Sequence, residues 1–67
     1  MKTFNVAVEL TDRLSGLISI TLETVQAYSR EQAIARAECE VERCAILETL
    51  GEYRPHDYAL HSRAWEA

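Results

Sequence analysis

Glycine, proline and cysteine are scarce in this sequence of 67 residues, which holds two glycines, one proline and two cysteines. Because Gly16 and Gly51 are the only glycines, the chain has no glycine-rich loop of the kind that binds phosphate groups. No apolar run approaches the roughly 18 residues that a membrane-spanning helix needs. These absences exclude a P-loop nucleotide site and a transmembrane helix.

The amino terminus and the two cysteines indicate a cytoplasmic protein. The first residues, MKTFNVAVEL, alternate between polar and apolar side chains, so they lack the continuous apolar core of a signal peptide. Two cysteines without an export signal are typical of the reducing cytosol. We therefore expect a cytoplasmic location.

Basic residues are also outnumbered, with 7 Lys and Arg against 11 Asp and Glu, for a net charge of −4. Phosphate binding needs a basic surface, so this balance disfavours nucleic acid or an anionic membrane as a direct ligand. A basic protein surface is the natural counterpart of such a charge. A chain this short forms one domain, residues 1–67, whose thin core leaves a stabilising homodimer open.

Alternating apolar residues predict two strands, at about residues 3–10 and 17–27, joined as a hairpin by the turn formers TDRLSG. The apolar set expected to meet a helix is Phe4, Val6, Val8, Leu10, Ile18, Ile20 and Leu22. This prediction places Val8 opposite Ile18 and Phe4 opposite Leu22. A later slip of the alternation predicts a bulge near residues 23 and 24.

A helix is predicted at about residues 29–50. Ser29 and Gln32 form a capping box at its start, and Gly51 follows its last turn. The stretch AECEVERC, residues 37–44, lies within this helix. The residues expected to face the core are Ala33, Ile34, Ala37, Val41, Cys44 and Ala45. A weaker apolar stripe, which could be a dimer seam, comprises Ala35, Cys39, Ile46 and Leu50.

A weaker alternation at about residues 58–65 predicts a third strand. The fold class is therefore α+β, a two-layer β-β-α-β arrangement with a three-stranded sheet and one helix packed on one face. The third strand joins either the first strand antiparallel or the second strand parallel, through a right-handed crossover. On the uncovered sheet face we expect Asn5, Glu9, Ser19, Thr21, Glu23, His61, Arg63 and Trp65.

Two cysteines and two histidines spell C-x4-C-x11-H-x4-H, from Cys39 and Cys44 to His56 and His61, a spacing that resembles a zinc finger. Residues five apart on a helix point about 140° apart, so the two thiols do not converge. No cysteine or serine can be placed beside a histidine and an acid for nucleophilic catalysis. We predict no metal, no cofactor and no catalytic residue, and hence no enzyme.

Glutamates mark the candidate binding surfaces. Glu31, Glu38 and Glu42 form a stripe along the solvent edge of the predicted helix, which is either a solvated face or a surface for a basic partner. Trp65 is either a binding anchor or a lid over the sheet end. The candidate partner-binding residues are Glu31, Glu38, Glu42, Glu9, Glu23 and Trp65.

The elements MKTFNVAVEL, LISITLE and SREQAIARAECEVERCAILETL give a compact, acidic hairpin-helix-strand plan. In length, acidity and plan the chain resembles small acidic phage proteins that disarm bacterial defences, especially anti-CRISPR proteins. The resemblance implies a non-catalytic inhibitor that acts in the bacterial cytosol as a DNA mimic, on a basic surface such as that of a CRISPR effector. The alternative is a small self-associating structural or regulatory module, and a weaker one is a protein that uses the cysteines and histidines above.

Overall fold

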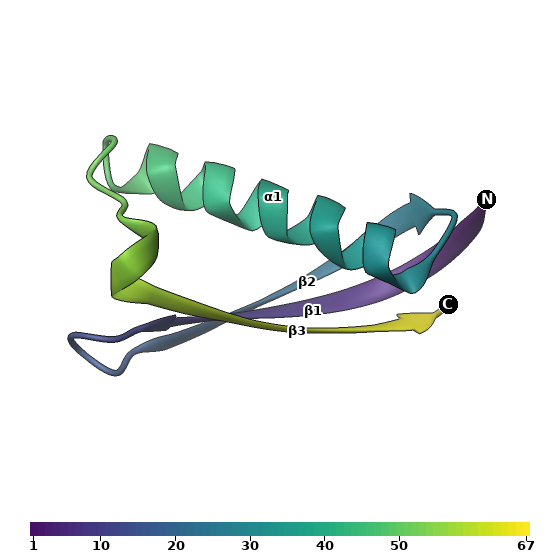
Figure 1. The fold of residues 1–67 in the computed structure, drawn as a ribbon, viewed down its shortest axis with the longest axis horizontal. Coiled ribbons are helices and arrows are strands. Elements are labelled where there is room, and N and C mark those ends of the chain that lie inside the picture. The colour runs from purple at the N-terminus through teal and green to yellow at the C-terminus, as the bar shows by residue number, and fades with distance from the viewer.

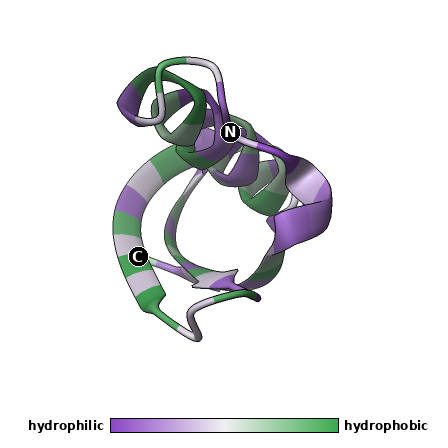
Figure 2. Cartoon of the chain, turned by 90° about the vertical axis from the view of Figure 1, so that its left-hand side faces the viewer, coloured by the Kyte–Doolittle hydropathy of each residue, from purple (hydrophilic) through white to green (hydrophobic).

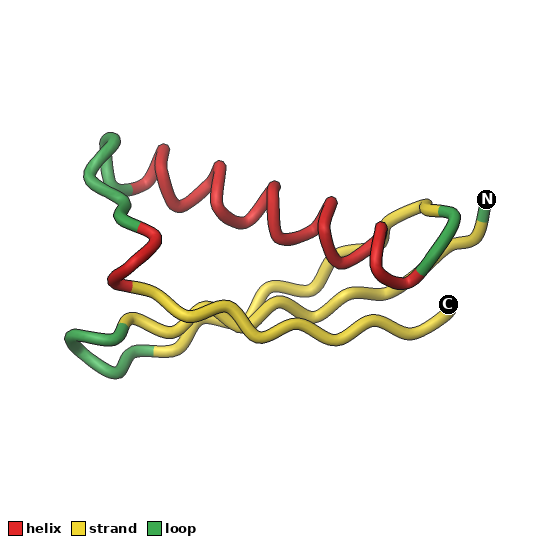
Figure 3. Tube along the Cα trace, in the orientation of Figure 1, coloured by secondary structure: helices red, strands yellow, loops and turns green.

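The computed structural model describes residues 1–67, which form two layers (Figure 1). Along the chain the elements are β1 (Lys2–Asp12), β2 (Ile18–Ala27), α1 (Arg30–Glu48), the 3-10 turn η1 (Pro55–Asp57) and β3 (Tyr58–Glu66). The sheet is antiparallel in the order β2-β1-β3, and α1 lies across one of its faces (Figures 1 and 3). The predicted α+β fold is confirmed, and β3 takes the antiparallel place beside β1.

The register between β1 and β2 differs from the predicted one. Phe4 pairs with Val25 and Val8 pairs with Thr21, whereas we predicted Leu22 and Ile18 as their partners. Because neighbouring side chains of a strand point to opposite faces, a displacement by an odd number of residues turns the whole of β2 over. The pairing also continues without interruption along both strands, so the predicted bulge is absent.

The turn between the strands explains this register. The carboxylate of Asp12 accepts hydrogen bonds from the backbone N–H groups of Leu14, at 2.9 Å, and Ser15, at 3.4 Å. The N–H of Gly16, whose φ is 78°, donates to the carbonyl of Asp12 at 2.8 Å, and the N–H of Asp12 donates to Leu17 at 2.8 Å. A side-chain acceptor and a left-handed glycine therefore close the turn, and the turn sets which residues pair.

The two faces of β2 are consequently exchanged relative to our prediction. Apolar side chains that we expected against α1 lie on the uncovered face of the sheet, namely Ile18, Ile20 and Leu22. Polar side chains that we expected on the uncovered face point toward the helix layer, namely Ser19, Thr21 and Glu23. Viewed end-on, apolar segments recur along the strands as well as in the helix (Figure 2).

The core is thin and built largely from small side chains. The buried residues between sheet and helix are Phe4, Val6, Val8, Ala27, Ala33, Ala37, Val41 and Ala45, and Ala7 is buried on the opposite face of the sheet. The helix face was predicted correctly apart from Cys44, which is exposed. Cys44 borders a groove of about 350 Å³ between the last turns of α1 and β2, where the polar side of β2 gives the helix no apolar surface to pack on.

Hydrogen bonds at both ends define the helix. The hydroxyl of Ser29 accepts from the N–H of Gln32 at 3.1 Å, and the Gln32 side chain accepts from the N–H of Tyr28 at 2.7 Å, which confirms the predicted cap. At the other end the N–H of Gly51 donates to Ile46 at 2.8 Å. Leu50 and Gly51 both have a positive φ, 56° and 85°, so α1 ends at Glu48, two residues earlier than predicted.

Candidate partner-binding surfaces

Three glutamates lie in a row on the side of α1 that faces β3, and we call this row the acidic stripe: Glu31, Glu38 and Glu42. Glu38 accepts a hydrogen bond of 2.6 Å from the hydroxyl of Ser62 on β3. Glu31 is seven residues earlier and so lies on the same side of the helix. The acidic stripe therefore follows the junction between the helix and one edge strand.

The carboxyl-terminal end of the acidic stripe adjoins two tyrosines. The rings of Tyr53 and Tyr58 stack with their centroids 4.9 Å apart. Burial, followed by the negative charge of Glu42, raises the pKa of Tyr53 above its ordinary value of 10.0. Glu42 itself takes part in neither ion pair of the chain.

No ion pair neutralises the carboxylates of the acidic stripe. The chain contains two, between Lys2 and Glu66 at 3.0 Å and between Arg43 and Glu40. The hydrogen bond from Arg43 lowers the pKa of Glu40, as expected for an ion pair on a helix surface. Arg36, four residues before Glu40, does not pair with it and instead donates to the carbonyl of Gln26 at 2.6 Å.

The structure separates the two glutamates that we had placed together on the sheet. Glu9 lies on the uncovered face, paired with Ile20 and His61, whereas Glu23 points toward the helix layer and lines the groove beside α1. The cause is the register of β2, which places its odd-numbered residues opposite the even-numbered residues of β1. Glu9 and Glu23 therefore cannot contact one flat partner surface.

The uncovered face of the sheet, which we call the open face, is the second candidate surface. By register it comprises Thr3, Asn5, Ala7, Glu9, Thr11, Ile18, Ile20, Leu22, Thr24, Gln26, Ala59, His61, Arg63 and Trp65. No other element of the chain covers it (Figure 1). Trp65 lies opposite Asn5 and is 45% exposed, which makes it a half-covered aromatic on a free surface.

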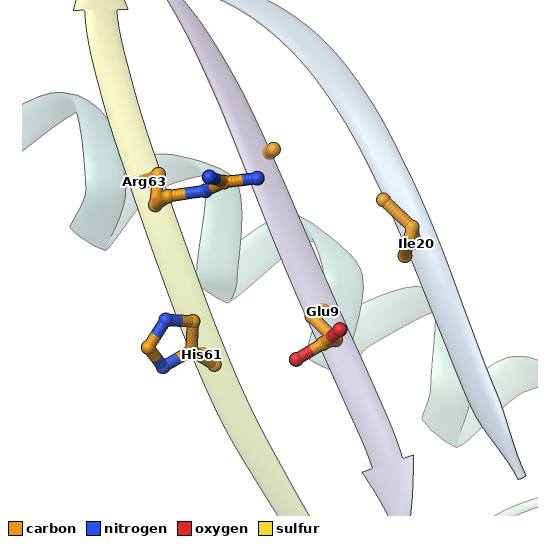
Figure 4. Close-up of a pocket in the computed structure, with 5 residues that line it drawn as sticks. Glu9, Ile20, His61 and Arg63 are labelled. Atoms are coloured by element: carbon orange, nitrogen blue, oxygen red, sulfur yellow. The ribbon is translucent and has the colours of Figure 1, made fainter.

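A hollow of about 270 Å³ lies near the middle of the open face (Figure 4). Ala7 on β1 is one of its lining residues, and the side chain of Arg63 reaches from β3 toward β1 (Figure 4). Glu9 and His61 complete its polar rim, and Ile20 borders it on the β2 side. This hollow has room for a protruding side chain of a partner.

The cysteines and histidines do not assemble into a site. Cys39 and Cys44 are both exposed free thiols. His56 belongs to η1, whereas His61 lies on the open face. No group of three or more potential metal ligands converges anywhere in the chain.

No helix has both the length and the apolar character that crossing a membrane requires.

Sequence reasoning missed the apolar half of the open face, although one signal pointed to it. Val25 and Ala27 are apolar at odd-numbered positions of β2, and we interpreted them as the result of a bulge. They belong instead to the residues of β2 that face the helix, so Ile20 and its even-numbered neighbours must face outward.

Comparison of the chain with protein families, with curated proteins and with solved structures found no match.

Proposed function

We propose that this chain is a non-catalytic binding protein whose acidic stripe occupies a basic, nucleic-acid-binding surface of a partner. The observation that supports the proposal is the row Glu31, Glu38 and Glu42, three carboxylates on one side of a helix with no ion pair to neutralise them. Carboxylates arranged in this way attract a cationic surface over a long range and steer it toward the helix.

The spacing of the acidic stripe suits a surface that holds DNA. At a rise of about 1.5 Å per residue, Glu38 and Glu42 are about 6 Å apart along the helix axis, and Glu31 and Glu38 about 10 Å. One strand of DNA carries one phosphate charge per about 3.4 Å of helix axis, so the acidic stripe presents its three charges within the length of a few nucleotides. Arginine and lysine side chains that bind phosphates could therefore bind these carboxylates instead.

The partner class that we propose is a bacterial defence complex, and specifically a CRISPR effector, as the resemblance to phage inhibitors implies. Such a complex must carry an Arg- and Lys-lined channel because it holds nucleic acid. The chain itself has a net charge of −4, which opposes direct binding to DNA or RNA. Competition with DNA for that channel is the expected mode of action.

The test is displacement of labelled DNA from purified CRISPR effector complexes of several types. The wild-type protein should displace DNA from at least one of them. The variant Glu31→Lys with Glu42→Lys should displace it at least ~10-fold less well, because each reversal turns an attraction into a repulsion. Glu38 is left unchanged because it binds Ser62 and has a structural role.

The matched control is Glu9→Lys with Glu23→Lys, which makes the same change of net charge on two other surfaces. This control should retain most of the displacement activity if the acidic stripe is the contact. Equal loss in both variants would show that only net charge matters. Full activity of the Glu31 and Glu42 variant would exclude the acidic stripe as the binding surface.

A further inference from the structure

We propose that the open face is the interface of a homodimer in which two copies pack sheet against sheet. The proposal does not depend on the acidic stripe, which lies on the opposite layer of the molecule.

The open face exposes an unbroken apolar row on β2. Ile18, Ile20 and Leu22 are 57%, 66% and 72% exposed, and all three point away from the helix. Trp65 adds a large half-exposed aromatic on β3. Contiguous apolar side chains on one surface mark an interaction site, whereas single ones are ordinary. A cluster of Trp, Ile and Leu side chains gains free energy when a partner surface excludes water from it.

The surface area of the chain agrees with a missing partner. A monomer of 7.6 kDa is expected to expose about 4,300 Å², from the scaling of surface with mass. This chain exposes 4872 Å², about 600 Å² more than that expectation. A stable protein interface covers about 800 Å² on each partner, so the excess is close to the area that one copy would contribute.

The charge of the open face favours a second copy of the chain, rather than a charged partner, as the molecule that covers it. The face carries one carboxylate, Glu9, and one guanidinium, Arg63, with His61 beside them, so it is neutral although the chain is strongly acidic. Two such faces do not repel each other, and Glu9 of one copy can approach Arg63 of the other. A basic partner, by contrast, has nothing to bind here and would prefer the acidic stripe.

The shape of the open face suits a contact between two copies. Ile18, Ile20 and Leu22 follow one another along β2 on this face, and Ile20 borders the hollow at Ala7 on the central strand (Figure 4). An isologous interface applies the same patch twice, so Ile20 of each copy can enter the hollow of the other. Small side chains opposite large ones let two sheets approach to the usual packing distance of about 10 Å.

The edge of β2 is protected, which favours packing through the face over pairing through the edge. Thr3 turns its carbonyl toward β3, where it accepts from the N–H of Ala67 at 3.0 Å, so the carbonyl of its partner Gln26 faces the free edge. Arg36 covers this carbonyl with a hydrogen bond of 2.6 Å. Glu23 adds a charge that points inward from the same strand, a common device against edge pairing.

The first experiment is sedimentation equilibrium over a dilution series, with Ile20→Lys as the test variant and Ile46→Lys as its control. Both positions are exposed isoleucines, but Ile46 lies on the outer side of α1, in the apolar stripe that we had first considered as a dimer seam. The wild type and Ile46→Lys should form dimers of equal affinity. Ile20→Lys should raise the dissociation constant at least ~10-fold, since it buries a charge in the interface.

A wild type that stays monomeric at millimolar concentration would overturn the proposal, as would a dimer weakened by Ile46→Lys and not by Ile20→Lys. Should Ile20→Lys fail to fold, Ile46→Lys and the fluorescence of Trp65 in the wild type still decide. Trp65 is the only tryptophan, so its fluorescence reports directly on the open face. Its emission should move to longer wavelength as the dimer dissociates. Dissociation without this change would place the interface elsewhere and refute the proposal.

Discussion

Asp12 determines which face of β2 meets the helix, although it is an exposed residue in a turn. Its carboxylate accepts from the N–H groups of Leu14 and Ser15, and these bonds hold the loop that sets the register of the hairpin. The same hydrogen bonds lower the pKa of Asp12 below its ordinary value of 3.8, and the bond from the backbone N–H of Leu14 makes the largest contribution to this shift. Through the turn that it closes, Asp12 therefore influences which residues of β2 lie on the open face.

We expect Asp12→Ala to lower the urea midpoint at neutral pH, because two N–H groups of the turn lose their acceptor. The contribution of Asp12 also depends on pH. A pKa that is lower in the folded state gives stabilisation that is present above 3.8 and is lost as the pH falls through the folded-state value. The midpoint of the wild type should therefore approach that of Asp12→Ala below about pH 4.

Asp12→Asn is the control, since it keeps an oxygen acceptor without a titrating proton. Urea titrations of the three proteins from pH 7 to pH 2 would measure the effect. A constant difference between wild type and Asp12→Asn across this range would contradict the proposed origin of the pH dependence.

At the scale of elements, the helix and sheet meet through very few large side chains. Val6 and Val8 are the largest fully buried residues, and the facing side of α1 contributes alanines and Val41. Small side chains allow a close approach of helix and sheet but bury little apolar area, at about 25 cal/mol per Å². The contact therefore tolerates little disturbance.

We expect Val41→Asp to unfold the domain, because it buries a charge without a partner at a cost of about 3 kcal/mol or more. Cys44→Asp is a matched control on the same helix. Cys44 was predicted to face the core but is exposed, so this substitution should leave the thermal melting curve close to that of the wild type. Unfolding of both variants would show that the helix packs in the orientation predicted from the sequence.

At the scale of the whole molecule, the acidic stripe and the open face lie on different layers and would act through different forces. A sheet-to-sheet dimer would leave both helices, and hence both acidic stripes, on its outer surfaces. Each dimer could then present two acidic stripes to separate basic surfaces. The proposed dimer depends mainly on apolar burial, whereas the proposed partner contact depends mainly on charge.

Salt should therefore separate the two interactions. Screening becomes effective within about 10 Å at 0.1 M salt, so displacement of DNA from a partner should weaken steeply as salt is raised further. The dissociation constant of the dimer should change little or decrease over the same range. Titration of both quantities with sodium chloride would measure this. Strong salt dependence of the dimer would contradict an apolar interface, and salt-independent displacement would contradict electrostatic mimicry.

Local signals in the sequence determined the elements and the fold class of this protein. The alternation of residues 3–10 and the capping box at Ser29 act over one strand or one helical turn, and both predictions are confirmed within a few residues. The helix face was also predictable, because a period of 3.6 residues places Ala33, Ala37 and Val41 on one side whatever they pack against.

Which surfaces the protein presents follows from the three-dimensional pairing of its strands. Both faces of β2 carry apolar residues. The sequence alone assigned Ile20 to the core and attributed the apolar Val25 to a bulge near residues 23 and 24. Hydrogen bonds in the turn at Asp12 hold a register that differs from the predicted one by an odd number of residues. Because neighbouring side chains of a strand point to opposite faces, this difference exchanges the two faces of β2. The separation of Glu9 from Glu23 and the apolar row on the open face follow from that exchange, because a strand has two sides and its pairing with a neighbour chooses between them.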